Sequence, residues 1–146
     1  MAVFSRHATL AWTEDAAPHT AHVSAGTGAF RVAASGPRLA GEPEGVTTPE
    51  EMLAASHAIC YGIGLRSLIA QQGGRASRVE VTATITATKD ARGIRLQGSH
   101  LQARVHGLEG LDAARLPELA LATEQGCTIS NALRAAVHIT FDVTAA

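Results

Sequence analysis

Apolar and polar residues alternate most regularly in residues 77–90, and this period of two predicts a half-buried β-strand. Residues 94–105 continue the alternation after a turn, but the apolar positions change parity, from 94 and 96 to 101, 103 and 105. A β-bulge near Gly98 and Ser99 would explain this change, because a bulge inserts one extra residue into a strand. Residues 136–144 alternate again and predict a last strand.

The N-terminal part of the chain predicts three short strands in an antiparallel meander. Residues 7–14, 19–26 and 29–35 show partial alternation, with Gly or Pro between the segments. A segment rich in Gly, Pro and Glu follows at residues 35–46 and predicts a loop.

Residues 47–74 predict one long helix. Apolar or small residues occupy nearly every face of it between residues 52 and 70, so we expect this helix to be surrounded on most sides. One chain of 146 residues can hardly enclose a helix of that length, which favours a partner subunit. The end signals are Thr48 as N-cap, Pro49 in the first turn, Glu50 and Glu51 beside the positive helix end, and Gly73 with Gly74 at the stop.

Two further helices are predicted at residues 112–126 and 128–136. The resulting order of strands, long helix, strands, helices and strand is typical of the α+β class. The sequence has no internal repeat and no linker long enough to divide domains. We therefore expect a single domain over residues 1–146.

The composition narrows the classes of function. Apolar residues make up 46% and charged residues 17% of the chain, with a formal net charge of −1 and scattered Lys and Arg. This distribution gives no electrostatic footprint for nucleic acid or for an anionic membrane. The apolar run at residues 52–70 contains His57 and Arg66, which are too polar for a lipid-facing helix, and the N-terminus does not have the pattern of a secretory signal. We expect a soluble, cytoplasmic protein.

The two cysteines have very different surroundings. Cys60 lies within the apolar run AASHAICYGIGL, where burial alone would raise its pKa and make it inert. Cys127 lies in EQGCTISNAL at the start of a predicted helix, where the positive helix end would lower its pKa. A permanent disulfide is not expected in a reducing cytosol, whereas two unrelated buried thiols remain an alternative.

A metal site is a weaker interpretation of the same residues. His57 and Cys60 are three positions apart, so their side chains could share a helix face as two ligands. The cysteines, however, are 67 residues apart, and no paired ligand motif of the zinc type is present in the sequence. We expect no metal, and His57 is interpreted as a packed, hydrogen-bonded core histidine.

Two segments carry a resemblance to a known family. The segment TTPEEMLAASHAICYG resembles the T-N-P-E-E-L-hydrophobic-A-A-H-A-x-C-F signature of the OsmC/Ohr family of thiol peroxidases. The segment EQGCTISNAL is similar to the second cysteine motif of that family, G-C-P-[VI]-S, with Thr128 in place of the proline. Tyr61 replaces the phenylalanine of the first motif. Two motifs at a family-like separation are more specific than either motif alone.

The resemblance implies a fold and an activity. The fold would be the OsmC-like α+β fold, with antiparallel sheets packed around a long central helix in an intertwined homodimer. The activity would be the reduction of organic hydroperoxides, with Cys60 as the peroxide-reacting thiol and Cys127 as the resolving thiol. No metal or bound organic cofactor is implied. The expected partners are the hydroperoxide, a second copy of the chain and a dithiol reductant such as a dihydrolipoyl protein.

The resemblance also implies an acid and an arginine beside Cys60. Glu50 matches the acidic residue that positions a catalytic arginine in the family. The Ohr branch takes its arginine from the N-terminal strands, where TEDAAPHTAHV contains no Arg, whereas the OsmC branch takes it from the segment before the long helix, where Arg38 lies. The chain is therefore expected to belong nearer to OsmC, with Arg38 as the catalytic arginine and Arg31 as the second candidate.

Helix geometry gives a second reason to expect a dimer. Glu50 and Cys60 are ten residues apart, which separates their backbones by ~15 Å and rotates them by roughly 80° on an unbroken helix. Glu50 would then serve Cys60 of a partner across a two-fold axis more easily than Cys60 of its own chain. Three functions remain open: a peroxidase, a binding or redox-sensing protein on the same scaffold, and a structural dimer with incidental thiols.

Overall fold

The computed structural model describes residues 1–13, 21–35 and 45–146. They form two compact units, Met1–Met52 and Leu53–Ala146. Sheets and helices are both present, so the predicted α+β class is confirmed. The single domain expected over residues 1–146 stays a prediction.

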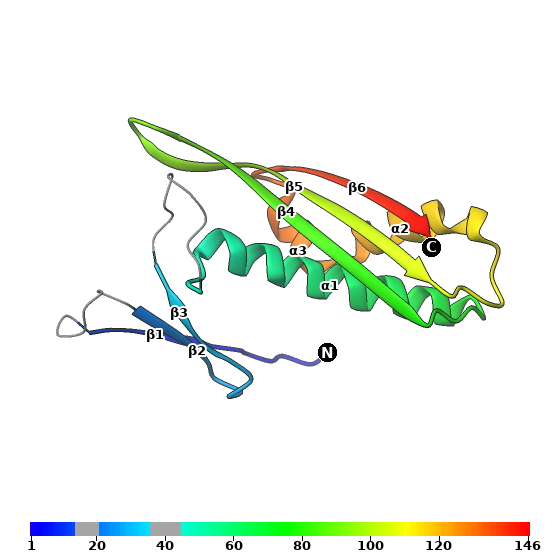
Figure 1. The fold of residues 1–146 in the computed structure, drawn as a ribbon, viewed down its shortest axis with the longest axis horizontal. Coiled ribbons are helices and arrows are strands. Elements are labelled where there is room, and N and C mark those ends of the chain that lie inside the picture. Colours follow the sequence, from blue (N-terminus) through cyan, green and yellow to red (C-terminus); the bar gives the residue numbers. More distant parts are fainter. Residues whose placement is uncertain (14–20, 36–44) are drawn as a thin grey trace. The chain divides into compact units, whose positions relative to one another are not determined.

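The first unit contains a three-stranded sheet. Strands β1 (Ala8–Trp12), β2 (Ala21–Ala25) and β3 (Arg31–Ala34) pair antiparallel in the order β1-β2-β3 (Figure 1). The tight connection between β2 and β3 contains Gly28 at φ +77, a conformation that glycine adopts without steric cost. The predicted N-terminal meander is confirmed.

Helix α1 spans Pro49–Gln71 without a break and connects the two units. The backbone N–H of Glu51 donates to Thr48 Oγ1 over 3.3 Å, as expected of an N-cap threonine. Gly73 follows the helix at φ +78, the left-handed conformation common at helix ends. By length and composition α1 could also cross a membrane, a test that the core helices of soluble proteins pass as well.

The second unit contains the larger sheet, in the order β4 (Arg78–Asp90), β5 (Gly93–His106) and β6 (His138–Ala145). Strands β4 and β5 form a long antiparallel hairpin, whereas β6 pairs parallel to β5. The expectation of antiparallel sheets is therefore wrong for β6. The physical reason is its connection: two helices separate β5 from β6, and a helical crossover of this length allows parallel pairing.

The predicted bulge is present in this hairpin, one residue earlier than expected. Thr86 pairs with Gly98 and Ala87 pairs with Leu96, so Gln97 is the extra residue. Beyond the bulge, the inward side chains of β5 change parity, as the sequence indicated. The fully or nearly fully buried positions of β5 are Ser99, Leu101, Ala103 and Val105.

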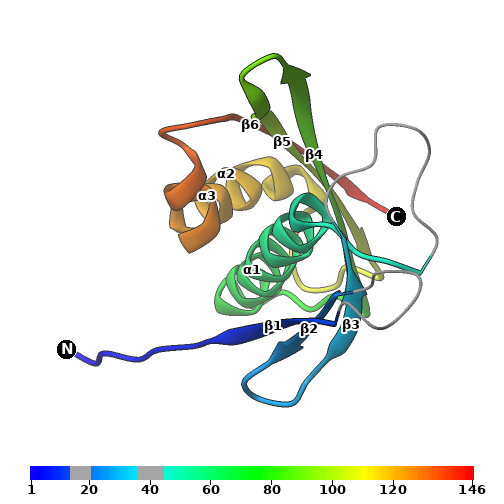
Figure 2. The same cartoon turned by 90° about the vertical axis from the view of Figure 1, so that its left-hand side faces the viewer.

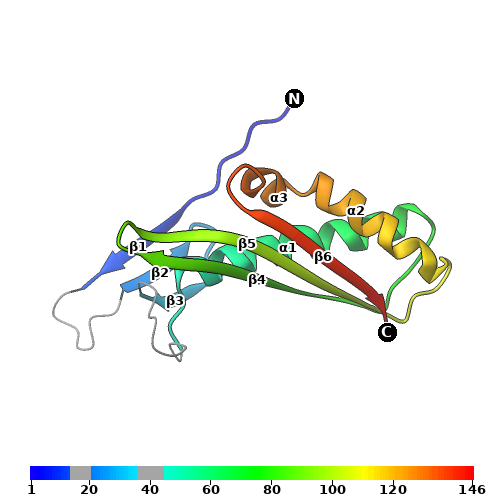
Figure 3. The ribbon, with the colours of Figure 1, turned by 90° about the horizontal axis from the view of Figure 1, so that it is seen from above.

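Helix α1 and the pair α2 (Leu116–Gly126) and α3 (Thr128–Leu133) cover the same face of this sheet (Figure 2). A short 3₁₀ turn, η1 (Ala113–Arg115), precedes α2, and Figure 3 shows α2 beside β6. The core lies between these layers and is built from aliphatic side chains and one tyrosine. Its buried members are Tyr61, Leu65, Ile69, Leu101, Ala103, Val105, Leu116, Leu119 and Ala120.

Only one side of α1 is buried in this unit. The buried positions recur every four residues, at His57, Tyr61, Leu65 and Ile69. Ile59 and Ile63 lie elsewhere on the helix and are 61% and 64% exposed. The part of the chain that the structure describes leaves these isoleucines uncovered, and the partner subunit expected to cover them stays a prediction.

Candidate active site

The two cysteines lie together in the second unit although 67 residues separate them in the sequence. Cys60 comes from the middle of α1 and is half-buried, whereas Cys127 follows α2 and is buried. Both are free thiols, and both line one pocket of about 270 Å³. Their side chains are close enough for Cys60 to contribute to the raised pKa of Cys127. The structure therefore brings together the two thiols that the sequence singled out.

Glycine allows the two helices to approach each other at this pocket. A Cβ at Gly64 would lie 3.2 Å from Cγ2 of Thr123, tighter than an ordinary van der Waals contact. Gly64 and Thr123 line the pocket from α1 and α2, respectively. The absence of a side chain at Gly64 thus lets α2, and with it Cys127, lie close to α1.

Cys127 is held at the junction of α2 and α3. Its backbone is extended, with φ −73 and ψ 120, and its Sγ accepts a hydrogen bond from the backbone N–H of Ser130 over 3.5 Å. The sulfur thus occupies the N-cap position of α3, which fixes where it points.

The helix end lowers the pKa of Cys127 as expected, through the backbone N–H of Ser130, but the net shift of this pKa is upward. Burial raises the pKa of this thiol, and the hydrogen bond with Cys60 raises it further. The hydrogen bonds from Ser130 lower the pKa, but they do not outweigh burial. The sequence showed the helix start, but it could not show that Cys127 is only 3% exposed.

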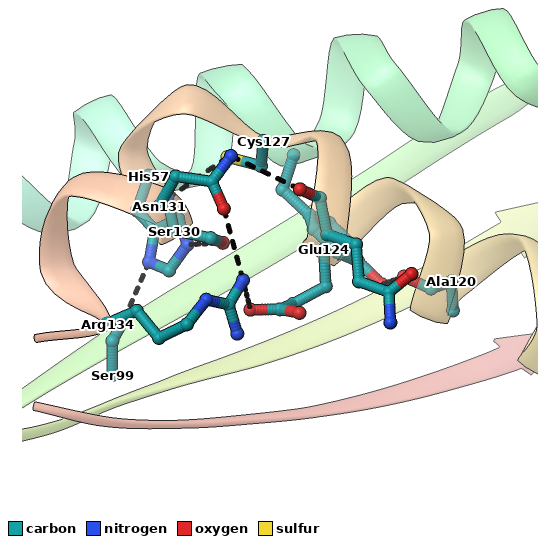
Figure 4. A network of polar contacts seen from close by, with 10 residues as sticks. His57, Ser99, Ala120, Glu124, Cys127, Ser130, Asn131 and Arg134 are labelled. Atoms are coloured by element: carbon teal, nitrogen blue, oxygen red, sulfur yellow. Dashed lines mark hydrogen bonds and ion pairs between the residues drawn. The ribbon is translucent and has the colours of Figure 1, made fainter.

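A buried hydrogen-bond network lies next to Cys127 and includes Ser130, which donates to the cysteine sulfur, and His57 (Figure 4). His57 is fully buried; its Nδ1 lies 2.8 Å from Ser99 Oγ and its Nε2 lies 2.8 Å from Ser130 Oγ. This confirms the interpretation of His57 as a packed, hydrogen-bonded histidine. Burial lowers the pKa of His57, an effect that the charge of Glu124 partly opposes.

Sequence reasoning did not identify the ion pair beside this network. Glu124 is buried in α2, and its Oε1 lies 2.8 Å from Nη2 of Arg134 (Figure 4). Arg134 also donates to Oδ1 of Asn131, whose side-chain amide donates to the backbone of Gln125. Together these contacts join the end of α2 to α3. Glu124 and Arg134 are ten residues apart across a helix junction, so no helical spacing connects them in the sequence.

The other predicted site residues lie in the first unit or outside the described residues. Glu50 lies in the first turn of α1, and its buried Oε2 has no hydrogen-bond partner among the residues that the structure describes. Arg38 lies outside the described residues. Arg31, the second candidate, is the exposed first residue of β3. The structure therefore leaves the arginine assignment a prediction.

Within residues 1–13, 21–35 and 45–146, His57 and Cys60 do not form part of a larger cluster of metal ligands. Both ring nitrogens of His57 are engaged by serine hydroxyls. Among the described residues, no group of three His, Cys, Asp or Glu side chains is placed to hold an ion.

Three comparisons place this geometry among known proteins. Residues 41–142 match the family model described as OsmC-like protein. The chain is 26% identical over 102 residues to peroxiredoxin OsmC of Escherichia coli K12, a match that covers 70% of this chain and 71% of the relative.

Solved structures show the same fold over nearly the whole chain. An organic hydroperoxide resistance protein OsmC from Legionella pneumophila superposes with a TM-score of 0.76 at 24% identity, covering 99% of both chains. The organic hydroperoxide resistance protein OhrB of Bacillus subtilis gives a TM-score of 0.73 at 23% identity, and the match covers 98% of this chain and 100% of the OhrB chain.

Proposed function

The chain belongs to the OsmC-like protein family, and on this premise we propose that it is a thiol-dependent peroxidase that reduces organic hydroperoxides, and hydrogen peroxide less well. The observation that carries the proposal is the shared pocket of Cys60 and Cys127. Two thiols from distant parts of the chain that line one pocket support a reaction in which a sulfenic acid at one thiol becomes a disulfide with the other. The name of the Escherichia coli relative, peroxiredoxin OsmC, agrees with this chemistry.

The reaction would run in three steps. The Cys60 thiolate attacks the distal oxygen of the hydroperoxide, so that an S–O bond forms, the O–O bond breaks, and the alcohol leaves after taking up a proton. The Cys127 thiolate then attacks the sulfur of the Cys60 sulfenic acid, forming the disulfide and releasing hydroxide, which becomes water on protonation. An external dithiol finally reduces the disulfide by two exchange reactions. No metal or bound organic cofactor takes part in these steps.

Glu50 and Arg38 would activate Cys60 in the first step. A guanidinium beside a thiol favours the thiolate, and a carboxylate can hold that guanidinium by charge-assisted hydrogen bonds. The buried oxygen of Glu50 that lacks a partner among the described residues is available for such an arginine. We assign the role to Arg38, with Arg31 as the second candidate, in a homodimer where one subunit's Glu50 serves the Cys60 of the other.

The residues around the thiols suit an organic substrate. Gly64, Leu68 and Ala122 line the pocket beside Cys60 and present small or aliphatic groups. An alkyl or aromatic hydroperoxide would bury apolar surface against them, which hydrogen peroxide cannot do. The reductant is proposed to be a dithiol, such as a dihydrolipoyl protein, in the cytoplasm.

Hydroperoxide consumption by the pure protein with dihydrolipoamide as reductant tests the proposal. Wild type and Cys60→Ser are compared, with cumene hydroperoxide and hydrogen peroxide in parallel reactions. We expect many turnovers by wild type, faster with cumene hydroperoxide, and none by Cys60→Ser. Equal rates for wild type and Cys60→Ser would contradict the proposal that Cys60 catalyses hydroperoxide reduction.

One observation favours a second function, a redox-sensing or small-molecule-binding dimer on the same scaffold. Cys127 is only 3% exposed and burial raises its pKa, so a smaller fraction of it is thiolate than in a free cysteine, which would prolong the life of an oxidised Cys60. The ratio of peroxide consumed to protein distinguishes the two functions. A sensor or binding protein consumes at most one equivalent even with excess dithiol, whereas a peroxidase consumes many.

A further inference from the structure

The pocket that the two cysteines share has an open side and a closed side. Three of the residues that line it from α1 and α2 are exposed: Gln71, Ala122 and Gly126. Cys60 lines the same pocket and is half-buried, whereas Cys127 is only 3% exposed. The open side therefore gives solvent partial access to Cys60 and almost none to Cys127.

The residues that enclose Cys127 are themselves buried. The backbone N–H of Ser130 donates to Sγ of Cys127 over 3.5 Å, and Ser130 is 0% exposed. The Ser130 hydroxyl lies 2.8 Å from Nε2 of His57, which is also 0% exposed. Thr123, at 4% exposed, lines the pocket from α2. The sulfur of Cys127 thus lies among buried groups, and its place at the N-cap of α3 holds it there.

This difference in access matters for the reduction of a disulfide between the two cysteines. In thiol–disulfide exchange a thiolate attacks one of the two sulfurs in line with the S–S bond that breaks, so the attacked sulfur needs open space on its far side. Attack on Cys127 would require that space at a sulfur enclosed by α2 and α3. Attack on Cys60 requires only the open side of the pocket.

We propose that the dithiol reductant attacks Cys60 from the open side between α1 and α2, and that Cys127 is the leaving group. The inference rests on the proposed function, in which the Cys60–Cys127 disulfide forms. The first thiolate of the reductant bonds to Cys60 while the protein disulfide breaks, and Cys127 leaves as a thiolate that takes up a proton. The second thiolate then attacks the reductant's own sulfur in the mixed disulfide and releases the Cys60 thiolate. The dithiol becomes a cyclic disulfide, and the electron pair it loses is the pair that the protein gains.

One effect opposes this direction of attack. Burial raises the pKa of Cys127, and a thiol with a higher pKa is a slower leaving group. The leaving-group effect, however, only changes the rate of an attack that can take place. A sulfur that the reductant cannot reach does not react at all, so access decides which of the two sulfurs is attacked.

The route to Cys60 is separate from the surface expected to contact a second subunit. Ile59 and Ile63 line a different groove, which α1 forms with Val79 and Val81 of β4. The pocket of Cys60 lies instead between α1 and α2. A partner that covers the two isoleucines therefore contacts another side of α1 than the one from which the reductant approaches.

Cleavage of the disulfide by cyanide tests the inference, because cyanide leaves a thiocyanate on the sulfur that it attacks. Diamide forms the disulfide in the wild-type protein, so the test does not depend on peroxidase activity. After cyanide treatment of the folded protein, unfolding at alkaline pH cleaves the chain before the cysteine that carries the thiocyanate, and fragment masses identify it. We expect cleavage before Cys60 to exceed cleavage before Cys127 by at least about tenfold. Cyanide treatment in urea, where both sulfurs are accessible, is the control and should give both cleavages in similar amounts.

Equal cleavage at the two cysteines of the folded protein, or cleavage mainly before Cys127, would overturn the inference. Failure of diamide to form the disulfide would overturn it together with the proposed resolving step. A disulfide that forms with diamide but not with cumene hydroperoxide, and that cyanide attacks at Cys60, would contradict the proposed function and support the inference.

A second measurement tests the route with dihydrolipoamide itself. A Cβ at Gly126 would meet no atom within 4 Å, so a side chain fits at this exposed edge of the pocket. Gly126→Leu should slow the reduction of the diamide-formed disulfide roughly tenfold by narrowing the approach to Cys60. Gln125→Leu is the matched control, because Gln125 is exposed on the same helix but does not line the pocket, and it should react like wild type. Equal rates for the three proteins would overturn the route through the open side.

Discussion

Oε1 of Glu124 lies 2.8 Å from Nη2 of Arg134, and the side chains are 5% and 48% exposed, respectively. The buried carboxylate of Glu124 is thus paired with the guanidinium of Arg134, which remains about half exposed to solvent. Removal of the cation would leave the anion buried beside the thiol pocket, because Glu124 belongs to the turn of α2 that precedes Cys127. The Glu124–Arg134 ion pair therefore contributes both to the stability of the fold and to the position of Cys127.

Arg134→Met should destabilise the protein by about 2 kcal/mol, since an unpaired buried charge costs more than the pair itself contributes. The measurement is the free energy of unfolding in urea at pH 7. Arg75→Met is the matched control, because the ion pair of Arg75 with Glu109 is largely exposed, and its loss should cost about 0.5 kcal/mol or less. The double substitution Glu124→Gln with Arg134→Met should recover part of the loss. Equal losses for Arg134→Met and Arg75→Met would contradict the prediction.

His57 should make the protein less stable as the pH falls. Burial lowers its pKa in the folded state, so the unfolded chain takes up a proton first as the pH falls below 6.5. The stabilisation by neutral His57 is therefore complete above pH 6.5 and is lost as the pH decreases toward the lowered folded pKa. Urea unfolding at pH 7.5 and pH 5 should show a smaller pH-dependent loss for His57→Gln than for wild type. His138→Gln, an exposed position on β6, should behave like wild type.

Cys127→Ser should separate the first chemical step from the second. Without the resolving thiol, cumene hydroperoxide should still oxidise Cys60 at a rate within about twofold of wild type, because the first step needs no second thiol. The sulfenic acid should accumulate and react with dimedone, which adds a defined mass to the peptide that contains Cys60. Multiple turnovers should decrease by at least about 100-fold. A Cys127→Ser protein that turns over as fast as wild type would show that Cys127 does not resolve the sulfenic acid.

Ile59 and Ile63 should lie in a subunit interface. Both are large, exposed apolar side chains on α1, 61% and 64% exposed in the single chain. Ile63→Glu would place an unpaired charge in that interface and should weaken dimerisation by roughly 100-fold or more, as measured by sedimentation equilibrium. Leu121→Glu, at a 46% exposed position on α2, is the control that should leave the dimer intact. A wild-type chain that sediments as a monomer at all concentrations would contradict the prediction.

Local sequence patterns were sufficient to predict the helices and strands. The alternation at residues 77–90, the change of parity before Leu101 and the capped helix at Pro49 each follow from neighbouring residues, and each is present in the structure. Two motifs also identified the two cysteines that share the pocket. These features depend on periods of two or 3.6 residues and on end signals, which a sequence displays directly.

Features that depend on packing between distant segments could not be predicted in this way. The parallel pairing of β6 with β5 depends on the path of α2 and α3 between them. The direction of the Cys127 pKa depends on burial, and the partners of His57 lie 42 and 73 residues away. A local sequence pattern shows neither whether a residue will be buried nor which residue 42 or 73 positions away it will contact.

The extra residue at Gln97 has a consequence for how this hairpin can evolve. Strict alternation from Leu96 would turn Gly98 and His100 toward the helices and Ser99 toward solvent. The bulge compensates for this change of face. The two ends of β5 can therefore follow different alternation patterns while both present their apolar side chains to the core. A deletion of Gln97 would therefore leave both ends of β5 facing as they do, because Leu96 and Gly98 already lie on opposite faces, whereas one extra residue elsewhere in β5 would force one end to turn over. Selection should accordingly tolerate loss of the bulge residue more readily than an insertion elsewhere in this strand.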